Sequence, residues 1–182
     1  MDQDVMLAYH EITPGKPFSL PQVAGLRFTP IEVARGNVRG SVIFLADFAN
    51  RKKCLFLWDI DHPGAARLTD EKPNLEIIVE YKDLLQNPDI LFLETNGWKV
   101  NSPGHGSLID AQPYLDIINP RQVILLHLSG HSDMPDKPAF GWSDVQWQQN
   151  IYRNPLYINH ALIAGNQGDD NSPVMLHYSL LK

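Results

Sequence analysis

The first clear pattern along the chain is an alternation of apolar and polar positions over residues 26–34, which predicts a strand. The β-branched residues Thr29, Ile31 and Val33 share one face of this strand. Pro30 lies on the other face and predicts a sheet edge or a bulge, because proline cannot donate to a strand ladder.

Later apolar runs do not alternate, and they predict strands of a different kind. Residues 41–48 and 54–58 are almost continuously apolar, as in strands that are buried on both faces. The short polar loop between them predicts a hairpin. Further strands are expected at residues 90–93, 123–128 and 174–181.

Helical spacing of apolar residues begins only in the second third of the chain. It predicts helices over residues 75–86 and 107–118, and a third over residues 143–152. Ser107 followed by Asp110 is a capping-box pattern, so either residue can mark the helix start, and Asn119 with Pro120 ends the helix. Strands that alternate with helices after a strand-rich start favour a layered α/β or α+β domain.

Composition and charge narrow the class of protein. With 182 residues, 43% hydrophobic and 20% charged, the chain fits one globular domain over residues 1–182 rather than a disordered protein. The net charge of -6 argues against a broad nucleic-acid surface. One cysteine, Cys54, favours a reducing compartment, and no apolar run is long enough to span a bilayer. We therefore expect a soluble, cytoplasmic protein.

Polar residues at the ends of buried strands are the candidates for chemistry. Asp59 follows the run CLFLW, with Asp61 and His62 close behind. A carboxylate at the mouth of a buried strand must be hydrated, paired or bound to a cation. The alternative is that Asp59 caps the turn before Pro63.

Two histidines occupy comparable positions. His127 interrupts the aliphatic run 123–128 and can be a metal ligand, a general base or a core histidine that bonds to the backbone. His105 lies between two glycines just before the predicted helix at 107–118, where a ligand can approach the backbone closely. The alternative for His105 is a loop histidine without a ligand. His131 and Asp133 follow His127, and the sequence does not say whether they join a site.

Asp59, His105 and His127 are more informative together than apart. Carboxyl ends of parallel strands meet at one edge of a sheet, so we expect these side chains to converge there. One carboxylate and two imidazoles suit zinc, manganese or iron, which activate water near neutral pH.

The stretch from about Leu26 to Trp142 resembles the C-terminal half of a metallo-β-lactamase-fold hydrolase, nearest to the phosphodiesterase branch that includes tRNase Z. The resemblance rests on the pieces TPIEVARGNVRGSVIFL, LFLWD, DILFLET, HGSLIDA and VILLHLSGH in this order. It implies part of an αββα sandwich, mainly the C-terminal sheet with outer helices. It also implies hydrolysis of a phosphodiester or another ester by metal-activated water.

The resemblance assigns roles to individual positions. Asp59 would bridge two metal ions, and His127 would be a terminal ligand to one of them. His105 would protonate the leaving oxygen or steady the scissile phosphate. The helix that starts at Ser107 would present its positive end to that phosphate. Glu94 falls where the family often has a polar residue, and no role follows for it.

Two departures from the family pattern lower the expected metal affinity. The chain contains no HxHxDH motif, which supplies the family's main ligands. Arg35 stands where family members place a ligand histidine, and a guanidinium cannot ligate a metal. We expect weak or no metal binding by the isolated chain unless ligands come from elsewhere. Arg35 could instead hold an anion, which favours the alternative of a non-catalytic, truncated member that acts as a binding or assembly module.

A half-sandwich has a consequence for partners. Its sheet exposes the face that normally packs on the other half, and large exposed apolar patches usually become interfaces. We therefore expect a homodimer, or a partner chain that supplies the other half. A small-molecule or phosphodiester substrate is expected if the chain is active.

Overall fold

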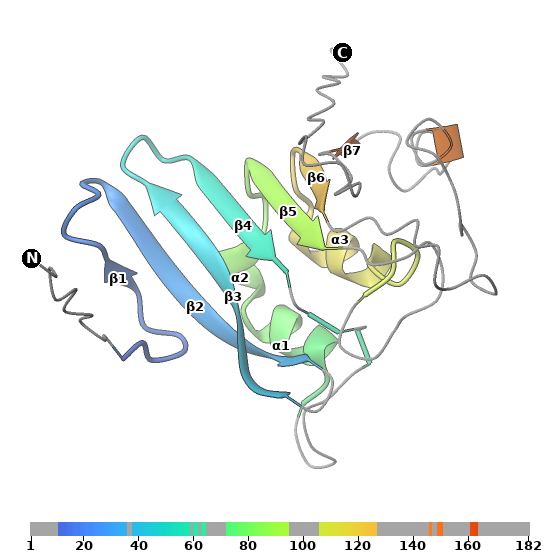
Figure 1. Cartoon of the computed structure of the whole chain (residues 1–182), viewed down its shortest axis with the longest axis horizontal. Helices are drawn as coiled ribbons and strands as arrows, with labels where there is room; N and C mark the ends of the chain where they lie inside the picture. The colour runs from blue at the N-terminus through green and yellow to red at the C-terminus, as the bar shows by residue number, and fades with distance from the viewer. Residues whose placement is uncertain are drawn as a thin grey trace, which may run out of the picture.

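One sheet organises the part of the chain that the computed structural model describes (Figure 1). Its strands lie side by side in the order in which they follow one another in the sequence, from β1 to β7. The described residues are 11–35, 38–58, 60, 61, 63, 64, 72–94, 106–126, 146, 149, 150 and 161–163.

The first four strands form an antiparallel meander. It consists of β1 (Phe18–Ser19), β2 (Leu26–Arg35), β3 (Val38–Phe48) and β4 (Lys53–Leu57). The predicted strand at 26–34 and the predicted hairpin between the next two strands are confirmed. The two residues of β1 are too few to show a pattern, and the sequence does not predict that strand.

The remaining strands run parallel to β4. They are β5 (Ile90–Glu94), β6 (Val123–Leu126) and β7 (Ala161–Ile163), the last of which the sequence does not predict. The expected strand at 174–181 lies outside the described residues. The mixed sheet with its helices confirms the predicted α/β layered class.

Pro30 occupies the edge position that its chemistry requires. It lies in β2 beyond the two residues that β1 pairs with. Its carbonyl oxygen accepts the N–H of Gly15 at 2.7 Å, so a loop rather than a strand flanks it. The bulge in β2 comes later, where the register shifts between Val33 and Arg35.

Three helices pack together on one face of the sheet (Figure 1). They are α1 (Asn74–Glu80), α2 (Lys82–Leu85) and α3 (Gln112–Ile118). The chain adds β5 and β6 in one direction, and right-handed crossovers then place these connecting helices on the same side. No helix within the described ranges is both long and apolar enough to cross a membrane.

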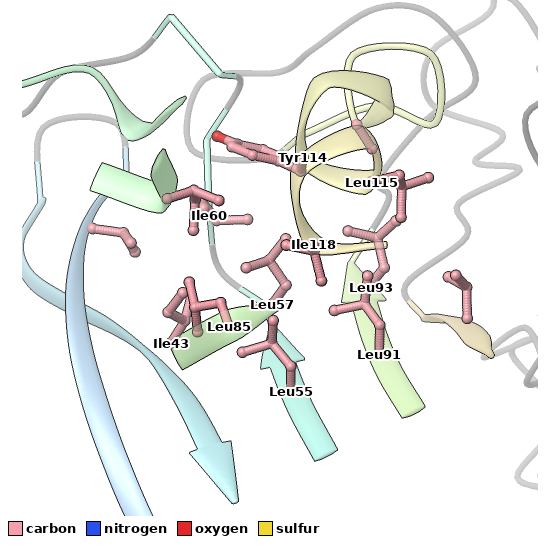
Figure 2. Packing of buried hydrophobic residues seen from close by; sticks show 14 of the residues in the cluster. Ile43, Leu55, Leu57, Ile60, Leu85, Leu91, Leu93, Tyr114, Leu115 and Ile118 are labelled. Carbon is pink, nitrogen blue, oxygen red and sulfur yellow. The ribbon is translucent and has the colours of Figure 1, made fainter. Parts of the chain in front are cut away.

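The core lies between these helices and the sheet (Figure 2). The β-branched face of β2 points into it, as its alternation predicts. On each neighbouring strand, every second residue is buried on this same face of the sheet. Apolar residues of the three helices pack against these strand residues. The cluster includes Ile31, Ile43, Leu45, Leu55, Leu57, Leu91, Leu93, Val123 and Leu125 from the strands, and Ile78, Leu85, Tyr114, Leu115 and Ile118 from the helices.

The opposite face of the sheet carries a row of half-buried aromatic rings, here called the aromatic face: Phe28, Phe44, Phe56 and Phe92. Phe56 stacks on Phe92 with ring centroids 4.8 Å apart, and Phe28 meets Phe44 edge-on at 6.3 Å. The prediction that these strands are buried on both faces is therefore only half right. The helices cover one face, and the aromatic face keeps partial contact with solvent.

The predicted helix at 75–86 is two helices. Tyr81 separates α1 from α2, although Ile78 and Leu85 on either side of it both face the core and are fully buried. The apolar spacing continues across the break, which explains why the sequence predicts a single helix. Residues 146, 149 and 150, which belong to the predicted helix at 143–152, are helical.

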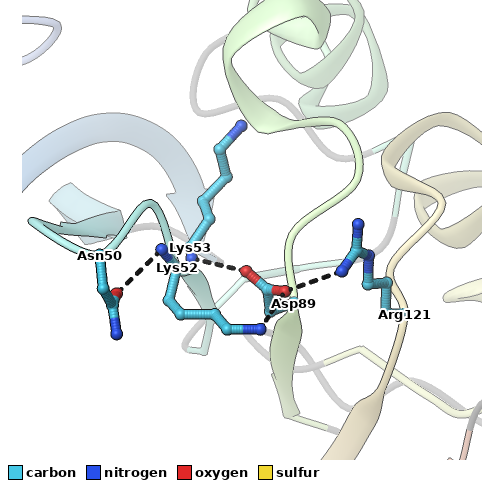
Figure 3. A network of polar contacts seen from close by, with 5 residues as sticks. All are labelled: Asn50, Lys52, Lys53, Asp89 and Arg121. Carbon is cyan, nitrogen blue, oxygen red and sulfur yellow. Dashed lines mark hydrogen bonds and ion pairs between the residues drawn. The ribbon is translucent and has the colours of Figure 1, made fainter.

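One carboxylate ties together the amino ends of three parallel strands (Figure 3). Asp89, just before β5, accepts the backbone N–H of Lys53 at 2.9 Å. It also pairs with Lys52 at 3.1 Å and with Arg121, just before β6, at 3.2 Å. The Lys53 N–H bond is the main reason that the pKa of Asp89 lies below its ordinary value.

Candidate functional site at the carboxyl edge of the parallel strands

The candidate site residues follow the carboxyl ends of β4 and β6, and these ends lie at one edge of the sheet. Leu57 pairs with Leu93 of β5, and Leu93 pairs with Leu125 of β6. At the next step Glu94 pairs with Leu126. Asp59, His105 and His127 themselves lie outside the described residues, so the structure locates their neighbours in the chain.

The loop after β4 returns to the end of β2. Asp61 donates its backbone N–H to the carbonyl oxygen of Ala34 at 3.2 Å. Ala34 directly precedes Arg35, the last residue of β2, which is half-buried. The segment that follows Asp59 and the position that carries the arginine are therefore adjacent.

A second close approach joins this loop to the segment that follows His105. A Cβ atom added to Gly106 would lie 3.7 Å from the carbonyl oxygen of Ile60, so the two backbones are in van der Waals proximity. Residues 60 and 106 directly follow Asp59 and His105 in the sequence. The chain neighbours of these two candidates thus lie side by side.

Asn74 fixes the junction between β2 and the loop. Its side chain is fully buried at the start of α1. Its Oδ1 accepts the N–H of Ala34 at 2.7 Å, and its Nδ2 donates to the carbonyl of Ala34 at 3.0 Å and to that of Asp61 at 3.4 Å. One amide therefore serves both segments, and every polar atom of its side chain has a partner.

Tyr114 of α3, which Figure 2 shows, secures the same loop. Its hydroxyl donates to the carbonyl oxygen of Asp61 at 2.9 Å, and the side chain is only 2% exposed. Burial is the main cause that raises the pKa of Tyr114 above its ordinary value. The phenol therefore stays protonated near neutral pH and can donate this bond.

Ser107 is buried and engaged within its own turn. Its Oγ donates to the carboxylate of Asp110 at 2.7 Å and accepts the N–H of Asp110 at 3.2 Å. The expected helix start at Ser107 is wrong, because α3 begins at Gln112 with Ala111 as its N-cap. The same pair of bonds between Ser107 and Asp110 can form at the start of a turn or of a helix, so the capping-box pattern in the sequence fits both. Anion binding by Ser107 stays a prediction, and the expected positive helix end is not located there.

Two buried carboxylates accompany the loop and strand ends. Glu94 at the end of β5 is 4% exposed, and Asp61 is 6% exposed. Within the described ranges, no three His, Cys, Asp or Glu side chains are close enough to hold one ion. The described residues alone therefore do not form a metal site.

Sequence reasoning missed Asn74 and Tyr114. Both lie within or beside apolar helical patterns, where an amide and a phenol pass for surface or packing residues. The one signal in the sequence is Asn74 directly after Pro73, a polar side chain at the first position of an apolar helix.

Comparisons with known proteins show the fold and no closer kinship. No protein-family model matches the sequence, and no curated protein matches it significantly. The metallo-β-lactamase-fold protein YhfI from Bacillus subtilis is 13% identical, with a TM-score of 0.55 over 84% of this chain and 51% of its own. CmlA, a diiron β-hydroxylase from Streptomyces venezuelae, is 11% identical, with a TM-score of 0.54 over 85% of this chain and 32% of its own. The short form of human tRNase Z is 14% identical, with a TM-score of 0.43 over 59% of this chain and 37% of its own.

The fold of the matched part is that of metallo-β-lactamase-fold proteins. The chain spans about half or less of the length of each of these three structures. At this level of identity the likeness concerns the fold. The specific phosphodiesterase branch and the missing first half stay predictions.

Proposed function

We propose that the chain is a hydrolase-like protein of the metallo-β-lactamase superfamily, with its site at the carboxyl edge of β4 to β6. Asp59 and His127 are the proposed metal ligands, and His105 is the proposed catalytic residue. The observation that carries this proposal is the convergence of their chain neighbours. Ile60 lies beside Gly106, and β4 and β6, which precede Asp59 and His127, flank β5 at one edge.

Zinc, manganese or iron fits the proposed donor types, although the described residues supply no complete ligand set. An ion of this kind, when bound, lets water act as a nucleophile near neutral pH. The proposed substrate is a phosphodiester or another ester, and Arg35 beside the loop would hold its anionic group. Because the chain contains no HxHxDH motif, we propose that the ligands of this chain bind the ion weakly and that ligands supplied from elsewhere would complete the site. Supporting context comes from CmlA, which is a diiron enzyme.

Metal titration tests the proposal. Isothermal titration with zinc should show weak binding that Asp59→Ala and His127→Ala each abolish. Asp83→Ala, which removes an exposed carboxylate on α2, and His10→Ala are matched controls that should leave binding unchanged. Zinc binding that survives both site substitutions contradicts the assignment, and the absence of binding in the wild type contradicts the catalytic proposal.

The alternative is a non-catalytic assembly module, and the aromatic face favours it. With about 4.8 Å between strands and about 3.3 Å per residue, the sheet face formed by β2 to β6, which includes the aromatic face, has an area on the order of 500 Å² per copy. Two copies facing each other would then bury on the order of 1,000 Å², near the lower bound for a specific interface. We propose that a second copy of this chain packs on the aromatic face. We further propose that residues 1–182 form a single domain and that the protein is cytoplasmic.

Sedimentation velocity decides between the two oligomeric states. The wild type should dimerise, and more strongly at higher salt, since two chains of net charge -6 repel. Phe56→Ser on the aromatic face should give monomers, whereas Val79→Ser on the exposed side of α1 should not. A wild type that is monomeric at every concentration, or a Phe56→Ser variant that still dimerises, excludes this interface.

A further inference from the structure

Asn74 and Tyr114, from two helices, hold the loop segment Ile60–Asp61, which directly follows Asp59. We infer that both are positioning residues for the candidate site, fixing Ile60 and Asp61 against the end of β2. The inference rests on the proposed function, because it assigns the two residues to the same site.

The loop is fastened at three points. The carbonyl oxygen of Asp61 accepts the Tyr114 hydroxyl at 2.9 Å and the Asn74 amide at 3.4 Å. The Asp61 N–H reaches Ala34 at 3.2 Å, and Ala34 is itself bonded on both its N–H and its carbonyl by Asn74. Three elements, β2, α1 and α3, therefore define one short stretch of backbone.

Asn74 bonds to both main-chain groups of Ala34, at the bulge where the register of β2 with β3 shifts between Val33 and Arg35. A buried main-chain polar group needs such a partner, and an apolar side chain of similar volume would not supply one. At this junction the Asn74 side chain bonds to main-chain atoms of Ala34, which directly precedes Arg35, and of Asp61, which lies in the loop after Asp59. Functional side chains need backbone positions fixed to within about 0.5 Å, and bonds to the main chain supply this.

Tyr114→Phe is the decisive variant, because it removes one hydroxyl and keeps the ring. Tyr81→Phe is the matched control, since it removes a phenol from the same helical layer and leaves the loop untouched. We expect hydrogen exchange of the Asp61 amide to accelerate about five- to tenfold in Tyr114→Phe, as for the loss of one buried hydrogen bond. The amides of β3 should keep their protection. Zinc binding should weaken about tenfold in the same variant. Asn74→Ala should act in the same direction, and where it fails to fold, Tyr114→Phe decides.

Each outcome separates the inference from the proposed function. Unchanged exchange at Asp61 overturns the anchoring role, and so does acceleration that extends equally over β3, which would mean a loss of global stability. Faster exchange at Asp61 with unaltered zinc affinity shows that the loop's order does not serve the site. If the wild type binds no zinc, the proposed function fails, and exchange at Asp61 alone decides whether Tyr114 holds the loop.

Discussion

Asp89→Ala should be the most destabilising single change among the charged residues of Figure 3. The carboxylate bond to the half-buried Lys53 N–H is worth about 1.5 to 2 kcal/mol, as for a hydrogen bond to a charged group. The two ion pairs add about 0.5 kcal/mol each or less, because the Lys52 and Arg121 side chains are 60% and 72% exposed. The expected total is about 2 to 3 kcal/mol of unfolding free energy.

Urea denaturation near neutral pH measures this loss. Arg121→Ala removes one ion pair and leaves the backbone bond, so it should cost about 0.5 kcal/mol or less. Asp89→Asn keeps one oxygen for the Lys53 N–H and should fall between the two alanine variants, at about 1 kcal/mol. If Asp89→Ala costs no more than Arg121→Ala, the carboxylate does not anchor β4 and the reasoning is refuted.

Acid titration gives an independent reading of the same carboxylate. Its pKa in the folded protein lies below the ordinary 3.8, so its contribution is fully present above that value and is lost as the pH falls through the folded pKa. The stability gap between the wild type and Asp89→Asn should therefore narrow as the pH falls below about 5 and through the folded pKa. A gap that stays constant over this range would mean that the charged form gains nothing on folding.

Three further predictions concern the core, the site and the lone thiol. Leu57→Ala should lower the free energy of unfolding by about 2 to 5 kcal/mol in urea denaturation, because Leu57 is fully buried. Val79→Ala, at a 52% exposed position, should lower it by less than about 0.5 kcal/mol. Equal losses in the two variants would mean that the core is misplaced. Arg35→His should raise zinc affinity in a titration, and unchanged affinity would argue that this position faces away from the site. Alkylation of Cys54 should require a higher pH than that of a free cysteine, because burial and then the charge of Asp89 raise its pKa. Asp89→Asn should shift this profile toward lower pH, and an unmoved profile would exclude the charge effect.

Local patterns in the sequence are enough to predict most of the strands. The β-branched row of β2 points into the core because alternation with period two assigns a face directly. In β3 and β4 the apolar runs are continuous, so the pattern assigns no face to either strand. Which face the helices cover follows from the crossover direction between strands, which is a property of the whole sheet.

The anchoring of the candidate site was beyond sequence reasoning for a physical reason. The Asn74 and Ala34 bonds join residues 40 positions apart, and the Tyr114 and Asp61 bond spans 53 positions. Nothing in the local sequence of either helix indicates such a partner. The candidate residues Asp59 and His127 were found because they interrupt or follow apolar runs, and their convergence itself stays a prediction.

The sequential order of the strands has a consequence for how the chain folds. Each strand from β1 to β7 pairs with its predecessor, so no strand has to insert between two that are already paired. The antiparallel pairings close short loops, whereas each parallel pairing joins distant residues, such as Cys54 and Ile90, so the meander should form before the parallel part of the sheet. The sheet can grow outward from the β2–β3–β4 meander as synthesis proceeds, and the crossovers to β5 and β6 add α1, α2 and α3 to one layer.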